Sequence, residues 1–199
     1  MIRRLAILTV LGITAMGATA QESAKKYKEI KQQKIGPVMN ASAADVWQIV
    51  GPGFEDAYKW STAVDHSVGS GEPEFEGATC SKRSCEINAK GFSDIGEQVI
   101  EYSDANRVLA YDVVAGLPGF VSSVTNQWTV VEVGPNQSQL QMAITVRMKP
   151  FMGAMMGGMF KKKLNTTIDG VISDLKIYAE TGEISTEKKE RNEKLAMAN

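Results

Sequence analysis

A cluster of methionines is the first feature of this sequence that suggests chemistry. Its members lie within KPFMGAMMGGMFKKK, residues 149–163, and their spacing of i, i+3, i+4 and i+7 would place them on one face of a helix. They are Met152, Met155, Met156 and Met159. Thioethers suit Cu(I), but no His or Cys accompanies them, and Phe151 and Phe160 flank them. This composition favours an adaptable apolar wall, with a Met-based copper carrier as the weaker alternative.

The only imidazole of the chain belongs to His66, which follows Asp65. Such a pair can act in acid–base catalysis, but no nucleophile-elbow motif accompanies it, so we assign no catalytic residue. Two cysteines and one histidine are too few for an ordinary zinc site. The sequence therefore predicts neither a metal site nor another cofactor.

The two cysteines, Cys80 and Cys85, lie close together in the segment CSKRSC. An even number of cysteines in an exported chain predicts a disulfide between them. In one straight strand their sulfurs would stand about 16 Å apart. The bond therefore requires the intervening SKRS to bend, so that the Cα atoms come within about 7 Å.

The first twenty residues have the form of a cleaved signal peptide. Arg3 and Arg4 precede a short apolar stretch, and Ala18-Thr19-Ala20 has the small-x-small form of a cleavage site. The apolar stretch is too short to span a bilayer comfortably, which disfavours the alternative of an uncleaved anchor. The prediction is a periplasmic or secreted protein, cut after Ala20, with no stable membrane insertion afterwards.

Length and charge limit the remaining classes of function. Without Arg3 and Arg4, the 22 basic residues become 20 against 23 acidic ones, a net charge of −3, which does not suit a nucleic-acid-binding protein. One domain is expected over residues 24–184, followed by a charged tail, 185–199, that we expect to be solvated or frayed. The sequence indicates no particular oligomeric state.

The hydrophobic pattern changes period along the chain. A first strand is expected within 27–39, then short helices over 40–53 and 54–60, the former capped by Ser42. Strands separated by turns follow, and in 140–149 apolar and mostly polar residues alternate as in an antiparallel strand. Over 161–182 the apolar spacing becomes three and four, which predicts a long amphipathic helix.

These elements predict an α+β fold in which a strongly curved antiparallel sheet of about seven strands wraps around the long C-terminal helix. Two short helices follow the first strand. The apolar face of the sheet must be buried, and the long helix is the element available to cover it. A strongly curved sheet closed by one helix tends to leave a cavity.

Several segments resemble the START-like polyketide cyclase/dehydrase superfamily, also called SRPBCC. IGPVMNASAADVWQIVGPG resembles its opening strand and helix, with the Val46-Trp47 pair, and GATCSKRSCEI resembles its third strand, with Gly77 and Arg83. EYSDANRVLAYDVVAGLPGF is similar to the hairpin of the fourth and fifth strands, and NQWTVVEV and the final helix complete the order. The resemblance extends over about residues 27–182.

The resemblance implies a helix-grip fold whose hydrophobic cavity holds a ligand. Members of the superfamily bind lipids, sterols, plant hormones or polyketides, and a minority are enzymes. We therefore predict an exported protein that binds a small hydrophobic or amphipathic molecule, with a cyclase/dehydratase-type enzyme using His66 or Tyr111 as the alternative. The predicted ligand-binding residues are Trp47, Arg83, Tyr111, Phe120, Trp128, Met142, Met148, Phe151, Met155, Met156 and Phe160.

Within this set the polar and the apolar residues have different predicted roles. Arg83 and Tyr111 would orient the polar end of the ligand, because apolar pockets usually carry a few polar groups. The Met-rich segment is predicted to be a mobile start of the long helix that leans over the cavity mouth. Its glycines disfavour a rigid helix, and methionine fills irregular gaps.

Overall fold

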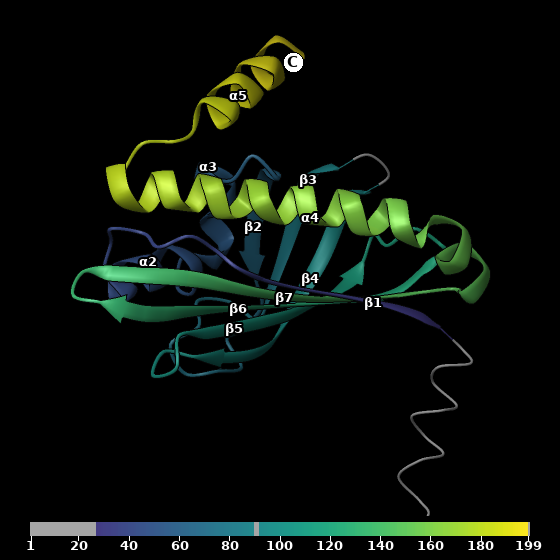
Figure 1. Cartoon of the computed structure of the whole chain (residues 1–199), viewed down its shortest axis with the longest axis horizontal. Coiled ribbons are helices and arrows are strands. Elements are labelled where there is room, and N and C mark those ends of the chain that lie inside the picture. The colour runs from purple at the N-terminus through teal and green to yellow at the C-terminus, as the bar shows by residue number, and fades with distance from the viewer. Residues whose placement is uncertain (1–26, 90–91, 199) are drawn as a thin grey trace, which may run out of the picture.

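The computed structural model describes residues 27–89 and 92–198, so the predicted signal peptide lies outside the described residues. Seven strands form one antiparallel sheet, and a long helix lies across one face of it (Figure 1). The strands are β1 (Lys28–Ile35), β2 (Val64–Ser70), β3 (Lys82–Ala89), β4 (Phe92–Ser103), β5 (Val108–Ala115), β6 (Val121–Gly134) and β7 (Gln137–Met148).

The strand order β1-β7-β6-β5-β4-β3-β2 places the first strand beside the last. All six neighbouring pairs are antiparallel, and β4 carries two register shifts against β5, which bend the strand. The sheet is curved and is not closed, because β1 and β2 remain its two edges. The predicted α+β helix-grip architecture is confirmed.

The predicted short helices also form. They are α2 (Ala43–Val50), the single 3₁₀ turn η1 (Phe54–Asp56) and α3 (Ala57–Trp60). The Ser42 hydroxyl accepts the N–H of Asp45 at 3.0 Å, which is the predicted N-cap, and α2 ends at Gly51.

The face of the sheet that α4 (Pro150–Thr181) covers is called the inner face below. Strand β7 shows the predicted alternation, since five apolar residues are buried and their neighbours are not. They are Leu140, Met142, Ile144, Val146 and Met148. From α4, Ile168, Val171, Ile172 and Leu175 enter the same core.

Helix α4 ends at the predicted residue and begins with the Met-rich segment, which was predicted to start it. Gly182 has a φ of 72° and its N–H bonds to the carbonyl of Tyr178, a left-handed end that glycine tolerates. Pro150 lies in the first turn, where its missing N–H leaves no bond unmade. The Met-rich segment is therefore continuous with the rest of α4.

The buried side of this segment is formed by glycines, not by methionines. Gly153 and Gly157 are buried against β1, and a Cβ on Gly153 would collide with the side chain of Lys28. At Gly153 the helix backbone can approach β1 this closely only because the residue lacks a side chain, whereas a Cβ on Gly157 would make only an ordinary contact with Ile30. Met155 and Met159 consequently face away from the sheet and are exposed. No helix in the ranges 27–89 and 92–198 is both long and apolar enough to cross a membrane.

The C-terminal tail, expected to be solvated or frayed, is helical, and most of its residues are exposed. Residues Thr186–Ala198 form helix α5, which follows the end of α4 after a short loop (Figure 1). Ser185 donates its hydroxyl to Asp174 at 2.6 Å, and the buried Lys188 ammonium donates to the carbonyl of Val64 at 2.8 Å. Arg191 forms two hydrogen bonds to the carboxylate of Asp65, at 2.8 and 2.5 Å.

Removing residues 183–199 should therefore reduce stability. We expect the free energy of unfolding to fall by about 2 kcal/mol, because Asp174 and Asp65 lose charge-assisted hydrogen bonds. Urea denaturation of the truncated and full-length chains measures this. The full-length variant Lys194→Ala/Met197→Ala, altered only at exposed α5 positions, is the control. A truncation no more harmful than the control would show that the packing of α5 adds nothing.

Candidate functional site

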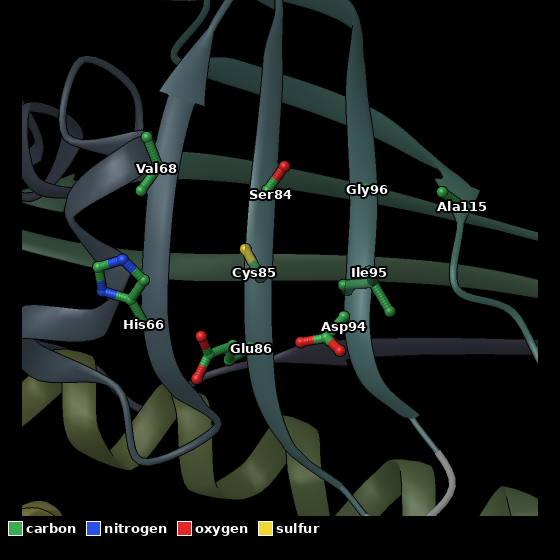
Figure 2. Close-up of a pocket in the computed structure, with 9 residues that line it drawn as sticks. All are labelled: His66, Val68, Ser84, Cys85, Glu86, Asp94, Ile95, Gly96 and Ala115. Atoms are coloured by element: carbon green, nitrogen blue, oxygen red, sulfur yellow. The ribbon is translucent and has the colours of Figure 1, made fainter.

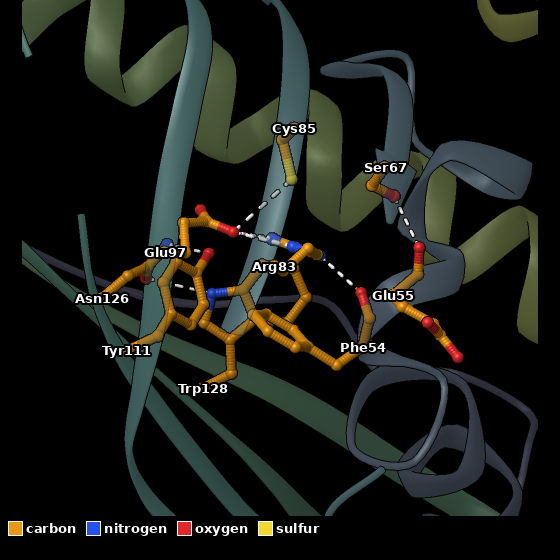
Figure 3. A network of polar contacts seen from close by, with 9 residues as sticks. All are labelled: Phe54, Glu55, Ser67, Arg83, Cys85, Glu97, Tyr111, Asn126 and Trp128. Carbon is orange, nitrogen blue, oxygen red and sulfur yellow. Dashed lines mark hydrogen bonds and ion pairs between the residues drawn. The ribbon is translucent and has the colours of Figure 1, made fainter. Parts of the chain in front are cut away.

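A buried ion pair joins β3 and β4 on the inner face of the sheet. Arg83 on β3 and Glu97 on β4 are directly opposite each other across the strands, and each is only 4% exposed. The guanidinium donates from Nε and Nη2 to Oε2 of Glu97, at 2.7 and 2.6 Å (Figure 3). Taking both charges out of water is costly unless they pair closely, as they do here.

Arg83 also joins the sheet to the short helices. Its Nη1 donates to the carbonyl of Phe54 at 2.5 Å, and the guanidinium carbon lies 3.8 Å from the centre of the Phe54 ring. Next to this contact, the Ser67 hydroxyl donates to the carbonyl of Glu55 at 2.5 Å, which fastens η1 to β2. Burial alone would lower the pKa of Arg83, but the charge of Glu97 outweighs it and raises that pKa above its ordinary value.

Two neutral acids border the ion pair. The Cys85 thiol donates to Oε2 of Glu97 at 3.5 Å, and burial raises the pKa of Cys85 to about 12. The ring of Tyr111 lies 5.6 Å from the Arg83 guanidinium carbon, and burial, with the Glu97 charge, raises the pKa of its phenol above the ordinary range. Both groups are therefore protonated at neutral pH, so neither is a ready base.

A line of polar groups continues from Tyr111 across the sheet. Asn126 donates its amide to the Tyr111 hydroxyl at 2.7 Å and accepts the indole N–H of Trp128 at 3.0 Å. The ring of Trp60, at the end of α3, meets Trp128 edge to face at 6.4 Å. Within the described part of the chain, the buried Nε1–H of Trp60 has no hydrogen-bond partner.

We call these residues the interior polar cluster: Trp60, Arg83, Glu97, Tyr111, Asn126 and Trp128. They come from α3 and from four strands, and apolar core residues surround them. A buried donor without a partner is unfavourable, so the Trp60 N–H is suited to an acceptor oxygen. The Tyr111 hydroxyl accepts from Asn126 and has its own proton as a further donor. The cluster can therefore orient a molecule that carries acceptor oxygens.

The structure brings together only some of the predicted ligand-binding residues. Arg83, Tyr111 and Trp128 meet in the interior polar cluster. Met142 and Met148 are buried on the inner face of β7, whereas Phe120, Met156 and Phe160 are half-buried at its margin. Trp47 packs on the ring of Tyr102 and donates to Asp104 at 2.6 Å. Phe151 and Met155 are exposed on α4 and are not brought to the inner face.

Sequence reasoning missed Glu97, Asn126 and Trp60 as members of this cluster. For Asn126 a signal existed, because it stands two residues before Trp128 on the same strand and therefore on the same face. For Glu97 a signal also existed, because Ile95 and Val99 stand two residues before and after it on β4 and therefore on the same face. A carboxylate at such a position is normally expected to face solvent unless a partner is known.

The structure does not form the predicted disulfide. Cys80 and Cys85 are both buried free thiols. The bend that the bond requires is missing, because the chain is already an extended strand paired with β4 from Lys82 onwards. Three strand residues span about 10 Å, beyond the reach of a disulfide.

His66 lies on the opposite side of the sheet from the interior polar cluster. It pairs across the strands with Glu86, which is exposed and alternates with the buried Cys85. Together with other residues of β2, β3 and β4, these two side chains line a pocket of about 320 Å³, which the buried Cys85 and Ile95 also border (Figure 2). His66 therefore does not share a cavity with Tyr111, as the enzyme alternative had assumed.

The described residues offer no ready metal centre. Among them, no group of three or more His, Cys, Asp or Glu side chains is placed to hold an ion. The methionines considered for copper share one face of α4, where Met155 and Met159 are exposed and Met152 and Met156 are half-buried, and the segment 149–163 holds no His or Cys to join them.

Comparison with known proteins agrees with this geometry. No functionally curated protein shows significant sequence similarity to the chain. Similar solved structures include the norcoclaurine synthase of Thalictrum flavum in complex with dopamine and hydroxybenzaldehyde, at 16% identity and a TM-score of 0.57, covering 87% of this chain and 96% of that one. The ZhuI aromatase/cyclase of Streptomyces sp. R1128 has 10% identity and a TM-score of 0.59, over 79% and 100% of the two chains.

A START superfamily protein from Mycobacterium smegmatis is also similar, with 18% identity and a TM-score of 0.52 over 74% of this chain and 98% of that one. At such identities these likenesses concern the fold. The family model described as polyketide cyclase/dehydrase and lipid transport matches residues 37–180, which include α2, strands β2 to β7 and nearly all of α4. The chain therefore belongs to the polyketide cyclase/dehydrase and lipid transport family.

Proposed function

We propose that this protein is an exported binding protein that holds a small hydrophobic or amphipathic ligand between the inner face of the sheet and α4. The observation that carries the proposal is the interior polar cluster, which places among apolar walls a buried donor, Trp60 Nε1, that has no hydrogen-bond partner in the described ranges. Membership of a family that includes lipid transport supports the same class of ligand.

The ligand would be bound mainly through its apolar part. Each Å² of apolar surface removed from water contributes about 25 cal/mol. At the margin of the core, half-buried apolar side chains would complete the wall around the ligand. They are Ile87, Leu117, Phe120, Phe160 and Leu164. Trp60 and Tyr111 would donate to an acceptor oxygen and so fix its orientation.

The described chemistry favours binding over catalysis. Tyr111 and Cys85 are held protonated, and the charges of Arg83 and Glu97 already neutralise each other. The single histidine faces the other side of the sheet. Export is supported by the sequence of residues 1–20, which carry the features of a signal peptide.

The test is native mass spectrometry of protein isolated from its own host, followed by solvent extraction of any bound molecule. We expect an added mass that dissociates as an apolar compound with at least one acceptor oxygen. Saturable binding of the neutral fluorophore N-phenylnaphthylamine should compete with that compound. Protein that carries no added mass and does not bind the fluorophore would refute the proposal.

Trp60→Phe tests the orienting role, because it removes the indole N–H and keeps an aromatic side chain, and the control below has the same loss of volume. We expect affinity for the extracted ligand to fall about fivefold, the effect of one hydrogen bond, with fluorophore binding unchanged. Trp47→Phe removes the indole bond to Asp104 in a different part of the core and is the matched control. Equal losses in both variants would mean that Trp60 only supports the fold.

A further inference from the structure

The outward face of the first turns of α4 carries an apolar stripe. It consists of Phe151, Met155 and Met159, which are 75%, 65% and 65% exposed. Their i, i+4, i+8 spacing aligns them on the side opposite Gly153 and Gly157, through which the helix packs on β1. The stripe lies at the end of α4 remote from α5 (Figure 1).

Basic residues border this stripe at both ends. Lys149 precedes the helix, and Lys162 continues the line of the stripe three residues beyond Met159, beside Lys161. All three lysines are exposed. No acidic residue occurs between Arg147 and Asp169, although acidic residues outnumber basic ones in the whole chain. The first half of α4 is therefore a locally cationic surface with an apolar centre.

We infer that this surface docks the protein on membranes that contain anionic phospholipids, with α4 lying along the interface. Phe151, Met155 and Met159 would enter the headgroup–acyl boundary while the lysines contact lipid phosphates, as in interfacial amphipathic helices. Charge complementarity selects this occupant. A second copy would bring two cationic patches together, which opposes self-association through the same face.

The inference is independent of the proposed ligand. Docking requires only the outward face of α4, whereas ligand binding requires the inner face of the sheet. A failure of one would leave the other standing, and the two are measured with different probes.

The test is co-sedimentation with vesicles of phosphatidylcholine containing about one third phosphatidylglycerol, at low salt. We expect the protein to bind these vesicles and to bind pure phosphatidylcholine far less. Raising the salt to about 0.5 M should release it, because exposed charges are then screened within a few ångströms. All proteins compared in these assays carry the same N-terminus, which a measurement of intact mass verifies.

Two triple variants separate the charges from the apolar stripe. Lys149→Gln/Lys161→Gln/Lys162→Gln should bind anionic vesicles about 100-fold more weakly, at about fivefold per lysine. Phe151→Ser/Met155→Ser/Met159→Ser should bind the same vesicles at least about tenfold more weakly. The matched controls change exposed lysines and exposed apolar residues elsewhere and should bind normally. They are Lys82→Gln/Lys189→Gln/Lys194→Gln and Ile35→Ser/Val133→Ser/Met197→Ser.

Three results would overturn the inference. One is the absence of vesicle binding at low salt, and another is binding that both triple variants retain. The third is association of the chain with itself or with another protein through Phe151, Met155 and Met159 while vesicles stay unbound. Circular dichroism of each variant, unchanged from the parent, ensures that a loss of binding is not a loss of fold.

Discussion

Arg83→Met should lower the free energy of unfolding by about 3–5 kcal/mol. The substitution keeps much of the side-chain volume but leaves the carboxylate of Glu97, which is 4% exposed, without its cationic partner. It also removes the bond from Nη1 to the carbonyl of Phe54, which holds η1 against the sheet. Urea denaturation at pH 7 measures the change.

Two comparisons identify the cause of that loss. The double variant Arg83→Met/Glu97→Leu should recover much of the stability, because no unpaired charge then stays buried. Arg147→Met, which breaks the exposed pair of Arg147 with Glu29 at 3.0 Å, should cost no more than about 1 kcal/mol. If Arg83→Met proved as mild as Arg147→Met, the ion pair would not be a major support of the core.

Local signals predicted most of the fold correctly. The alternation in β7, the Ser42 cap of α2 and the end of α4 at Gly182 each depend on residues close together in the sequence. The order of these elements then leaves few ways to bury one face of a sheet under one helix.

The site was harder to predict because its contacts join distant elements. Arg83 was predicted as a polar group of the cavity, but its partner Glu97 depends on the register of β3 against β4. A shift of that register by one residue would turn Glu97 to the outer face. The partnership of Lys188 with the carbonyl of Val64 joins residues 124 positions apart, and a polar tail gives no local sign of it.

The Met-rich segment shows a different limit of sequence patterns. Helical periodicity grouped the methionines because it weighs apolar side chains, and it predicted that their face would be buried. The structure instead buries Gly153 and Gly157, and at Gly153 the absence of a Cβ permits close approach to β1. Hydrophobicity alone does not register an advantage that comes from the absence of a side chain.

The second large expected effect concerns Cys85 at alkaline pH. A sample denatured without reductant should first present two reactive thiols per chain, since both cysteines are free in the structure. One disulfide and no thiol would contradict the structure. With the thiol count established, the folded protein should leave Cys85 unmodified at pH 8, because it is buried and protonated.

Stability should then fall as the pH rises above 9. Burial, reinforced by the Glu97 carboxylate, raises the pKa of Cys85 to about 12 from its ordinary value of 9.0. Below pH 9 the thiol is protonated in both states, so its contribution is fully present. Between pH 9 and 12 the unfolded chain releases a proton that the folded chain keeps, which favours unfolding by up to about 4 kcal/mol at the upper limit.

Cys85→Ala isolates this effect, because every other titrating group is common to both proteins. The variant has a fixed cost from the lost side chain, but it lacks the titration. The stability advantage of the parent over the variant should therefore shrink by about 2–3 kcal/mol between pH 8 and pH 11. Cys80→Ala is the comparison variant, because it removes the other buried thiol and leaves the bond between Cys85 and Glu97 intact. A parent–variant difference that stayed constant with pH would mean that the Cys85 thiol ionises as readily in the fold as in the unfolded chain.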